Sequence, residues 1–68
     1  MMTSAEIYAE INSRNVDIGK IAHDCFARRA NAVRVIEGVS RNQYLEKAIA
    51  EAIGKKRLEV FPPNKHEA

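Results

Sequence analysis

Apolar residues recur at intervals of three and four positions through most of the chain, which is the spacing of one face of an α-helix. The strongest example is a stripe at i, i+3, i+4, i+7 and i+8, formed by Leu45, Ala48, Ile49, Ala52 and Ile53. Shorter stripes with this period lie within 7–11, 18–25 and 32–36. No stretch alternates apolar and polar residues for long enough to predict a strand. The pattern therefore predicts an all-α fold of four to five short helices.

Capping residues mark the first two helices. Thr3 and Glu6 have the capping-box spacing, so a helix is expected within 3–15, and Asn15 is suited to end it. Asp17 then predicts the start of a second helix over 18–26. A change in the phase of the apolar positions indicates a turn within 26–28.

The second half of the chain shows similar boundaries. A third helix is expected at about 28–37, with Gly38 at its end. Ser40 and Gln43 repeat the capping-box spacing and predict the start of a fourth helix, which Gly54 ends. Residues 55–63 are expected to add at most one further turn before the prolines.

The length and the charge distribution predict one small domain whose positive charge lies in the middle of the chain. It has 68 residues, and we expect a single domain over 1–63 with a flexible tail at 64–68. The net charge is only +2, but residues 28–57 hold eight Lys and Arg against three Asp and Glu, a balance of +5. An anionic partner would therefore meet the middle of the chain.

Several functional classes lack their sequence signals. No apolar run approaches the about 18 residues of a membrane span, no signal peptide is evident, and Cys25 has no partner for an internal disulfide, so we expect a cytoplasmic protein. His23 and Cys25 would point apart on a helix, so they are not expected to share a metal. The chain shows no nucleophile–base pair and no phosphate-binding glycine loop. We expect no enzyme activity, metal, cofactor or small-molecule ligand.

The order of elements from Asp17 to Gly38 resembles the helix-turn-helix of the lambda-repressor and Cro type. Ile21 and Ala22 match that family's buried pair in its first helix, and Ala32 matches the inner face of its recognition helix. Two positions depart from the family, so either the turn has a different geometry or the recognition helix begins elsewhere. Phe26 stands where a glycine with positive φ is usual, and Arg28 stands where Ser or Thr usually caps the recognition helix.

The C-terminal part is similar to the Ner family of phage regulators. The run 50–54 (AEAIG) and the Phe61-Pro62 pair match that family's helix end and its following aromatic and proline. The two resemblances together cover roughly residues 4–62. They imply a sequence-specific regulator of transcription that binds double-stranded DNA, a phage- or prophage-type repressor with its recognition helix at about 28–37.

Four side chains of that helix have the chemistry to read base edges in the major groove: Arg28, Arg29, Asn31 and Arg34. Arginine donates two hydrogen bonds to guanine, and asparagine also forms two with adenine, donating one and accepting one. Arg41, after the helix, and Lys20, near the start of the second helix, are better placed for phosphates. In the alternative hypothesis the same fold is a small adaptor or inhibitor that binds protein and not DNA.

Residues outside the basic helix carry three further expectations. Glu46 and Glu51 are expected to be surface charges, and Tyr8, Tyr44, Phe61 and Cys25 to pack at or near the core. One small module covers few base pairs, so we expect a homodimer at least on DNA. Its contact is expected at the spare apolar residues of the C-terminal segment, which are Leu58, Val60 and Phe61.

Overall fold

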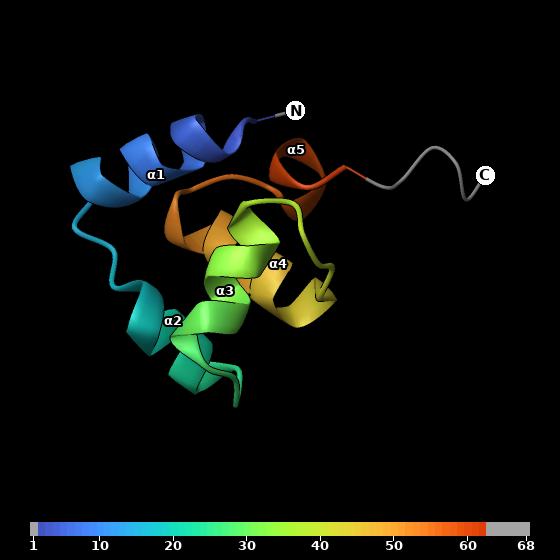
Figure 1. The fold of residues 1–68 in the computed structure, drawn as a ribbon. Coiled ribbons are helices and arrows are strands. Elements are labelled where there is room, and N and C mark those ends of the chain that lie inside the picture. The colour runs from blue at the N-terminus through green and yellow to red at the C-terminus, as the bar shows by residue number, and fades with distance from the viewer. Residues whose placement is uncertain (1, 63–68) are drawn as a thin grey trace.

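The computed structural model describes residues 2–62 and contains five helices with no strand in that range, which confirms the all-α fold (Figure 1). The expected tail at 64–68, and residue 63 of the expected domain, lie outside the described residues. The helices are α1 (Ser4–Ser13), α2 (Ile18–Asp24), α3 (Arg29–Ile36), α4 (Gln43–Ala52) and α5 (Arg57–Val60).

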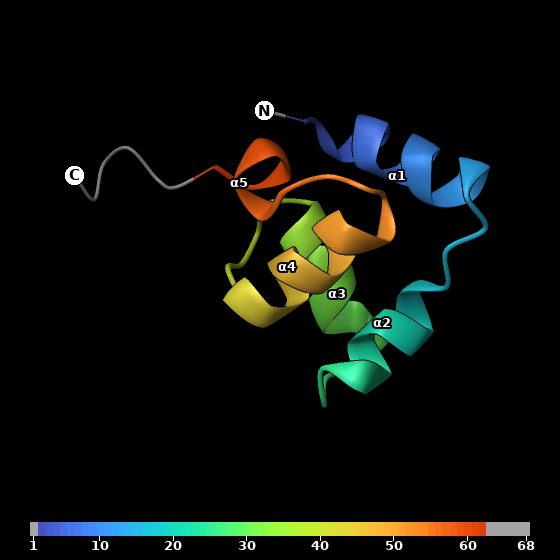
Figure 2. The same cartoon turned by 180° about the vertical axis from the view of Figure 1, so that it is seen from behind.

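The core lies between α3 and α4, with the other helices around that pair. α3 lies in front of α4 in Figure 1 and behind it in Figure 2, while α1 and α5 lie at one end and α2 at the other. The expected pair Ile21-Ala22 faces inward, Ala22 completely and Ile21 in part. The buried apolar cluster consists of Ile7, Ile11, Ile18, Ala22, Ala32, Val35, Ile36, Leu45, Ile49, Ala50, Ile53, Val60 and Phe61.

Each of the four longer helices ends in the same way. The residue after the C-cap takes a positive φ, and the next backbone N–H bonds back to the carbonyl five residues earlier, which is a Schellman motif. The residues with positive φ are Asn15, Phe26, Gly38 and Gly54. The sequence predicted Asn15, Gly38 and Gly54 as helix ends, and the structure confirms them.

Phe26 adopts a left-handed conformation, which glycine takes without strain. Its φ is 56°, its N–H donates to the His23 carbonyl at 3.0 Å, and the Ala27 N–H donates to the Ala22 carbonyl at 2.8 Å. A non-glycine residue in the left-handed region costs about 1–2 kcal/mol. The Schellman turn therefore forms with strain at Phe26. α3 begins close to the expected start, with Arg28 as an N-cap that makes no side-chain bond.

The start of α4 differs from the prediction. Asn42 is the N-cap, and its side-chain oxygen accepts from the backbone N–H groups of Tyr44 at 3.0 Å and Leu45 at 3.2 Å. The expected capping box of Ser40 and Gln43 was wrong, because Ser40 follows the Schellman turn at Gly38 and lies two residues before the true cap. Asparagine is as good an N-cap as serine, and local spacing did not separate the two.

Glu46 was expected on the surface, but only 1% of it is exposed. Its Oε2 accepts from Arg41 Nε at 2.8 Å and from the Asn42 N–H at 3.2 Å, and its Oε1 accepts from Arg57 Nη1 at 3.2 Å. Arg41 also donates to the carbonyls of Phe61 at 3.4 Å and Pro62 at 3.1 Å. These bonds form a clamp, the Glu46 clamp, that joins the loop before α4 to α5 and the segment after it.

The clamp corrects the expectation for the C-terminal segment. Val60 and Phe61 were predicted to be spare surface for a dimer contact, but they are 2% and 8% exposed and belong to the core. For Phe61 this confirms the other expectation, that it packs at or near the core. Leu58 remains exposed on α5. Tyr44, expected at the core edge, is 70% exposed at the start of α4. The structure turns Val60 and Phe61 inward and leaves Leu58 outside. The spacing of apolar residues in so short a segment did not predict which of them would be buried.

Replacing Glu46 with Gln is expected to lower the free energy of unfolding by about 1–3 kcal/mol, because an amide group then faces the arginine donors in a buried position. The partial exposure of Arg41 and Arg57 favours the lower end of that range. Urea denaturation measures the effect. Glu51→Gln, on the exposed side of α4, is the matched control and should change stability by less than about 0.5 kcal/mol. Equal losses in the two variants would contradict the role of the clamp.

Candidate functional site

The arginines of the chain divide into two groups by their partners. Arg14 pairs with Glu10 at 3.0 Å, and the guanidinium groups of Arg41 and Arg57 both bind Glu46. The other three arginines of the sequence are Arg28, Arg29 and Arg34. They all belong to α3 or its N-cap and are exposed, and within residues 2–62 they form no ion pair or side-chain hydrogen bond. Their guanidinium groups are therefore available to bind a partner.

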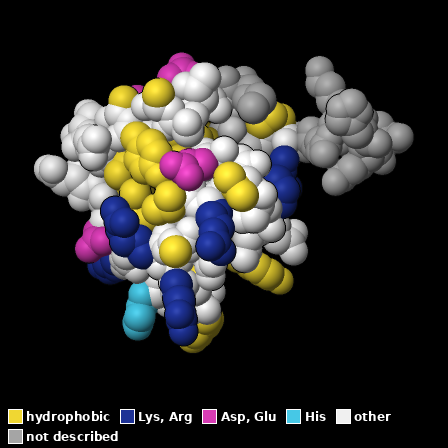
Figure 3. All heavy atoms as spheres, in the orientation of Figure 1, with side chains coloured by type: hydrophobic (Ala, Val, Ile, Leu, Met, Phe, Trp, Pro, Cys, Tyr) yellow, Lys and Arg dark blue, Asp and Glu magenta, His cyan; other side chains and the backbone are white. Residues whose placement is uncertain are grey.

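The outer surface of α3 follows from the packing of its inner side. Ala32, Val35 and Ile36 are buried, and at about 100° per residue the opposite side is centred near Arg34. Asn31 is also exposed and lies on a flank of that side. Figure 3 shows Lys and Arg side chains gathered on the face that α3 presents, with few acidic side chains among them. Long guanidinium arms from this helix can therefore reach one extended anionic partner.

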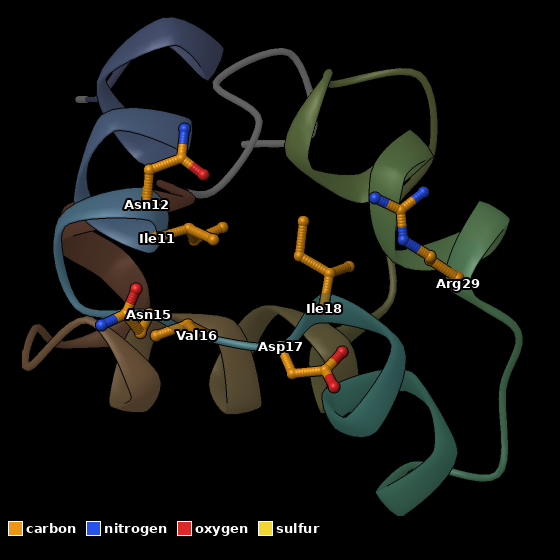
Figure 4. Close-up of a pocket in the computed structure, with 7 residues that line it drawn as sticks. All are labelled: Ile11, Asn12, Asn15, Val16, Asp17, Ile18 and Arg29. Carbon is orange, nitrogen blue, oxygen red and sulfur yellow. The ribbon is translucent and has the colours of Figure 1, made fainter.

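Arg29 lies on the other flank of α3, away from Asn31. It lines an open groove of about 430 Å³ together with side chains from the end of α1 and the start of α2, which are drawn in Figure 4. The polar members of this lining are Asn12, Asn15 and Asp17. Across this groove the Arg29 stem approaches α2, since a Cβ at Gly19 would lie in ordinary van der Waals contact with Arg29 Cδ, at 4.0 Å. The structure thus separates Arg29 from the other basic residues of α3.

The pKa of Tyr8, in α1, depends on charged groups at the neighbouring part of α3. Burial raises the pKa of the Tyr8 phenol above its ordinary value, and the Glu37 carboxylate raises it further. The Arg29 guanidinium acts in the opposite direction on this pKa. Both charged groups are therefore close enough to α1 to act on one phenol, which places Glu37 at the border of the basic surface.

The two residues expected to contact phosphates differ in their availability. Lys20 is exposed on α2, next to Gly19. Arg41, by contrast, directs Nε and both Nη groups into the Glu46 clamp and the carbonyls after α5. The donors of Arg41 therefore already have intramolecular partners, which gives this residue a structural role and argues against the expected phosphate contact.

Phe26 is a surface feature that the sequence did not reveal. Its side chain is fully exposed at the turn between α2 and α3, two residues before Arg28. Among the described residues the other large apolar side chains that are exposed are Val39, Tyr44 and Leu58. The sequence marked Phe26 as an unusual residue for this turn, but only the structure shows that its side chain is fully exposed.

No protein-family model, curated protein or solved structure matches this chain. Within residues 2–62 no helix is both long and apolar enough to cross a membrane. The same residues contain no group of three or more His, Cys, Asp and Glu side chains that could hold a metal ion. The features of the described residues that bear on function are therefore the charge and geometry of α3.

The charges around Tyr8 give a test of this geometry by tyrosinate absorbance. In a Tyr44→Phe background Tyr8 is the only remaining tyrosine. Arg29→Gln should raise the Tyr8 pKa further, because it removes the cation that stabilises the tyrosinate, and Glu37→Gln should lower it. Glu51→Gln serves as a control with no expected shift. Shifts in the opposite directions would contradict the positions of Arg29 and Glu37 relative to Tyr8.

Proposed function

We propose that this protein is a sequence-specific regulator that binds double-stranded DNA through α3, with α2 and α3 acting as a helix-turn-helix of the lambda-repressor type. The observation that carries the proposal is that α3 and its N-cap hold three arginines that have no ion-pair partner within residues 2–62, while the other three arginines are paired. A recognition helix needs a buried side that fixes it to the domain and a polar side that enters the major groove. α3 has both.

The separation of residues on α3 supports different roles for them. Arg34, with Asn31 and Arg28, extends from the outer side and the leading end of the helix, and we assign these three to base edges. Arg29 and Lys20 lie on the side of α1 and α2, and we assign them to phosphates, which fix the register of the protein on the duplex. Arg41 is not part of the proposed interface because the Glu46 clamp holds it.

A protein of this kind would act as a phage- or prophage-type repressor in the cytoplasm, associated with the nucleoid, by occupying an operator. The alternative is a small adaptor or inhibitor that uses the same fold to bind protein, and the fully exposed ring of Phe26 is the observation that favours it. Salt separates the two. Binding through several phosphates weakens by orders of magnitude between about 50 and 200 mM salt, whereas an apolar protein contact does not.

Selection from a random duplex library, followed by titration of the enriched sequence, tests the DNA proposal. Arg34→Ala should cost about 1–3 kcal/mol of binding and relax the preference at one base position. Arg29→Ala should weaken binding to all sequences alike and reduce the salt slope by about 1.

Arg14→Ala is the matched control, since Arg14 is exposed but paired on α1 and should leave binding unchanged. Selection without enrichment of any sequence would sink the proposal. Identical effects of the three substitutions would sink the assignment of roles.

We also propose that two copies pair on DNA through α5, where Leu58 is the apolar residue still exposed. Half-sites should be spaced by about 10 base pairs. Leu58→Ser should abolish cooperative occupancy of two half-sites but leave binding to one half-site within about twofold, because Leu58 lies outside α3. Footprinting with sedimentation measures this. Val39→Ser, another exposed apolar position, is the control, and a selected site that is short and asymmetric would contradict pairing.

A further inference from the structure

The aromatic ring of Phe26 makes no contribution to the fold that would explain its presence. The side chain is fully exposed, so it buries no apolar surface, and its backbone has a φ of 56°. Glycine would adopt this conformation without strain and donate the same N–H bond to His23, while the second Schellman bond comes from the Ala27 N–H. Strained backbone persists where surrounding structure imposes it, and such positions are concentrated at functional sites.

The turn holds this ring at the leading end of α3. Ala27 packs against the core, so the residues on each side of it, Phe26 and Arg28, extend from the surface. The bonds from the Phe26 and Ala27 N–H groups to the end of α2 fix the backbone from which the ring projects. In Figure 3 apolar and basic side chains protrude together at the end of the molecule where this turn lies.

The chemistry of the ring restricts what it can recognise beside these arginines. A phenyl group has no hydrogen-bond donor or acceptor, so it cannot read the polar edges of bases. The apolar feature of the major groove is the C5-methyl group of thymine, which accepts apolar contacts from side chains that include Phe. A stacking platform for unpaired bases needs several aromatic rings, but Phe61 is buried, Tyr8 is partly buried and Tyr44 is on another helix.

We propose that Phe26 is a specificity-determining residue that packs against a thymine methyl group in the major groove, at the end of the half-site that the α2–α3 turn approaches. This inference rests on the proposed DNA binding by α3. It adds an apolar contact to the polar contacts of Arg28, Asn31 and Arg34. It also gives the strain at Phe26 a role, because the strained turn places the ring next to the base edges.

Replacing thymine with uracil removes only the methyl group and leaves base pairing intact. Each thymine of the selected duplex is therefore changed to uracil in turn, and affinity is measured for the wild-type protein and for Phe26→Gly. At one position uracil should weaken wild-type binding about fourfold, the value of one buried methyl group. Phe26→Gly should weaken binding to the thymine duplex roughly tenfold, since the whole ring contact is lost.

The double-mutant cycle decides the assignment. Uracil at that position should have no effect on the affinity of Phe26→Gly, because its contact is already absent. Phe26→Gly should also have a higher denaturation midpoint than wild type, so weaker binding cannot be attributed to unfolding. Val39→Ala, an exposed apolar residue at the other end of α3, should retain the full uracil effect.

Three results would overturn the inference: no thymine whose replacement weakens wild-type binding, a uracil effect of equal size in Phe26→Gly, or full affinity in Phe26→Gly. All three require a protein that binds its selected duplex, so they leave the proposed function intact. Absence of any sequence-selective binding would instead defeat the proposed function. Loss of binding to a protein partner without a uracil effect would assign Phe26 to the adaptor alternative and would also overturn the inference.

Discussion

The buried carboxylate of Glu46 imposes the constraint on which much of the structure depends. A charge removed from water must be paired and hydrogen-bonded, and this one accepts from Arg41, Arg57 and the Asn42 backbone. Those donors come from the α3–α4 loop, the N-cap of α4 and α5. One carboxylate therefore holds together the segments that follow the basic helix, and the carbonyls after α5 complete the coordination of Arg41.

The clamp also explains why only part of the positive charge of the molecule is available to a partner. Residues 28–57 have a balance of +5, yet two of their arginines are bound to Glu46. The charge counted along the sequence therefore overstates the positive charge that is available to a partner after α3. For α3 itself, the count and the available charge agree. The consequence is a basic surface concentrated on one helix, bordered by Glu37 on one side and by the groove at Arg29 on another.

The two ends of α3 are fixed by different physical means. Its C-terminal end has Gly38 in a left-handed conformation, where glycine adopts a positive φ without steric cost. Its N-terminal end follows Phe26, which takes the same kind of conformation with strain, and Arg28, which caps the helix without a side-chain bond. A helix that is weakly specified at its leading end depends on its buried side for position, and Ala32, Val35 and Ile36 provide that side.

The sequence by itself determined the four longer helices, three of their four Schellman ends and most of the inward sides of these helices, because spacing, caps and glycines act within a few residues. It also identified the unusual residues at the turn before α3. It did not place the cap of α4, the buried Glu46 or the inward residues of α5. Only the tertiary structure decided which charged groups are paired. Glu46 lies five residues from Arg41 and eleven from Arg57, and Arg41 binds a carbonyl twenty-one residues away. Burial and pairing over such separations depend on how the helices pack, and a periodic pattern in one helix contains no information about the partner that another segment will bring to it.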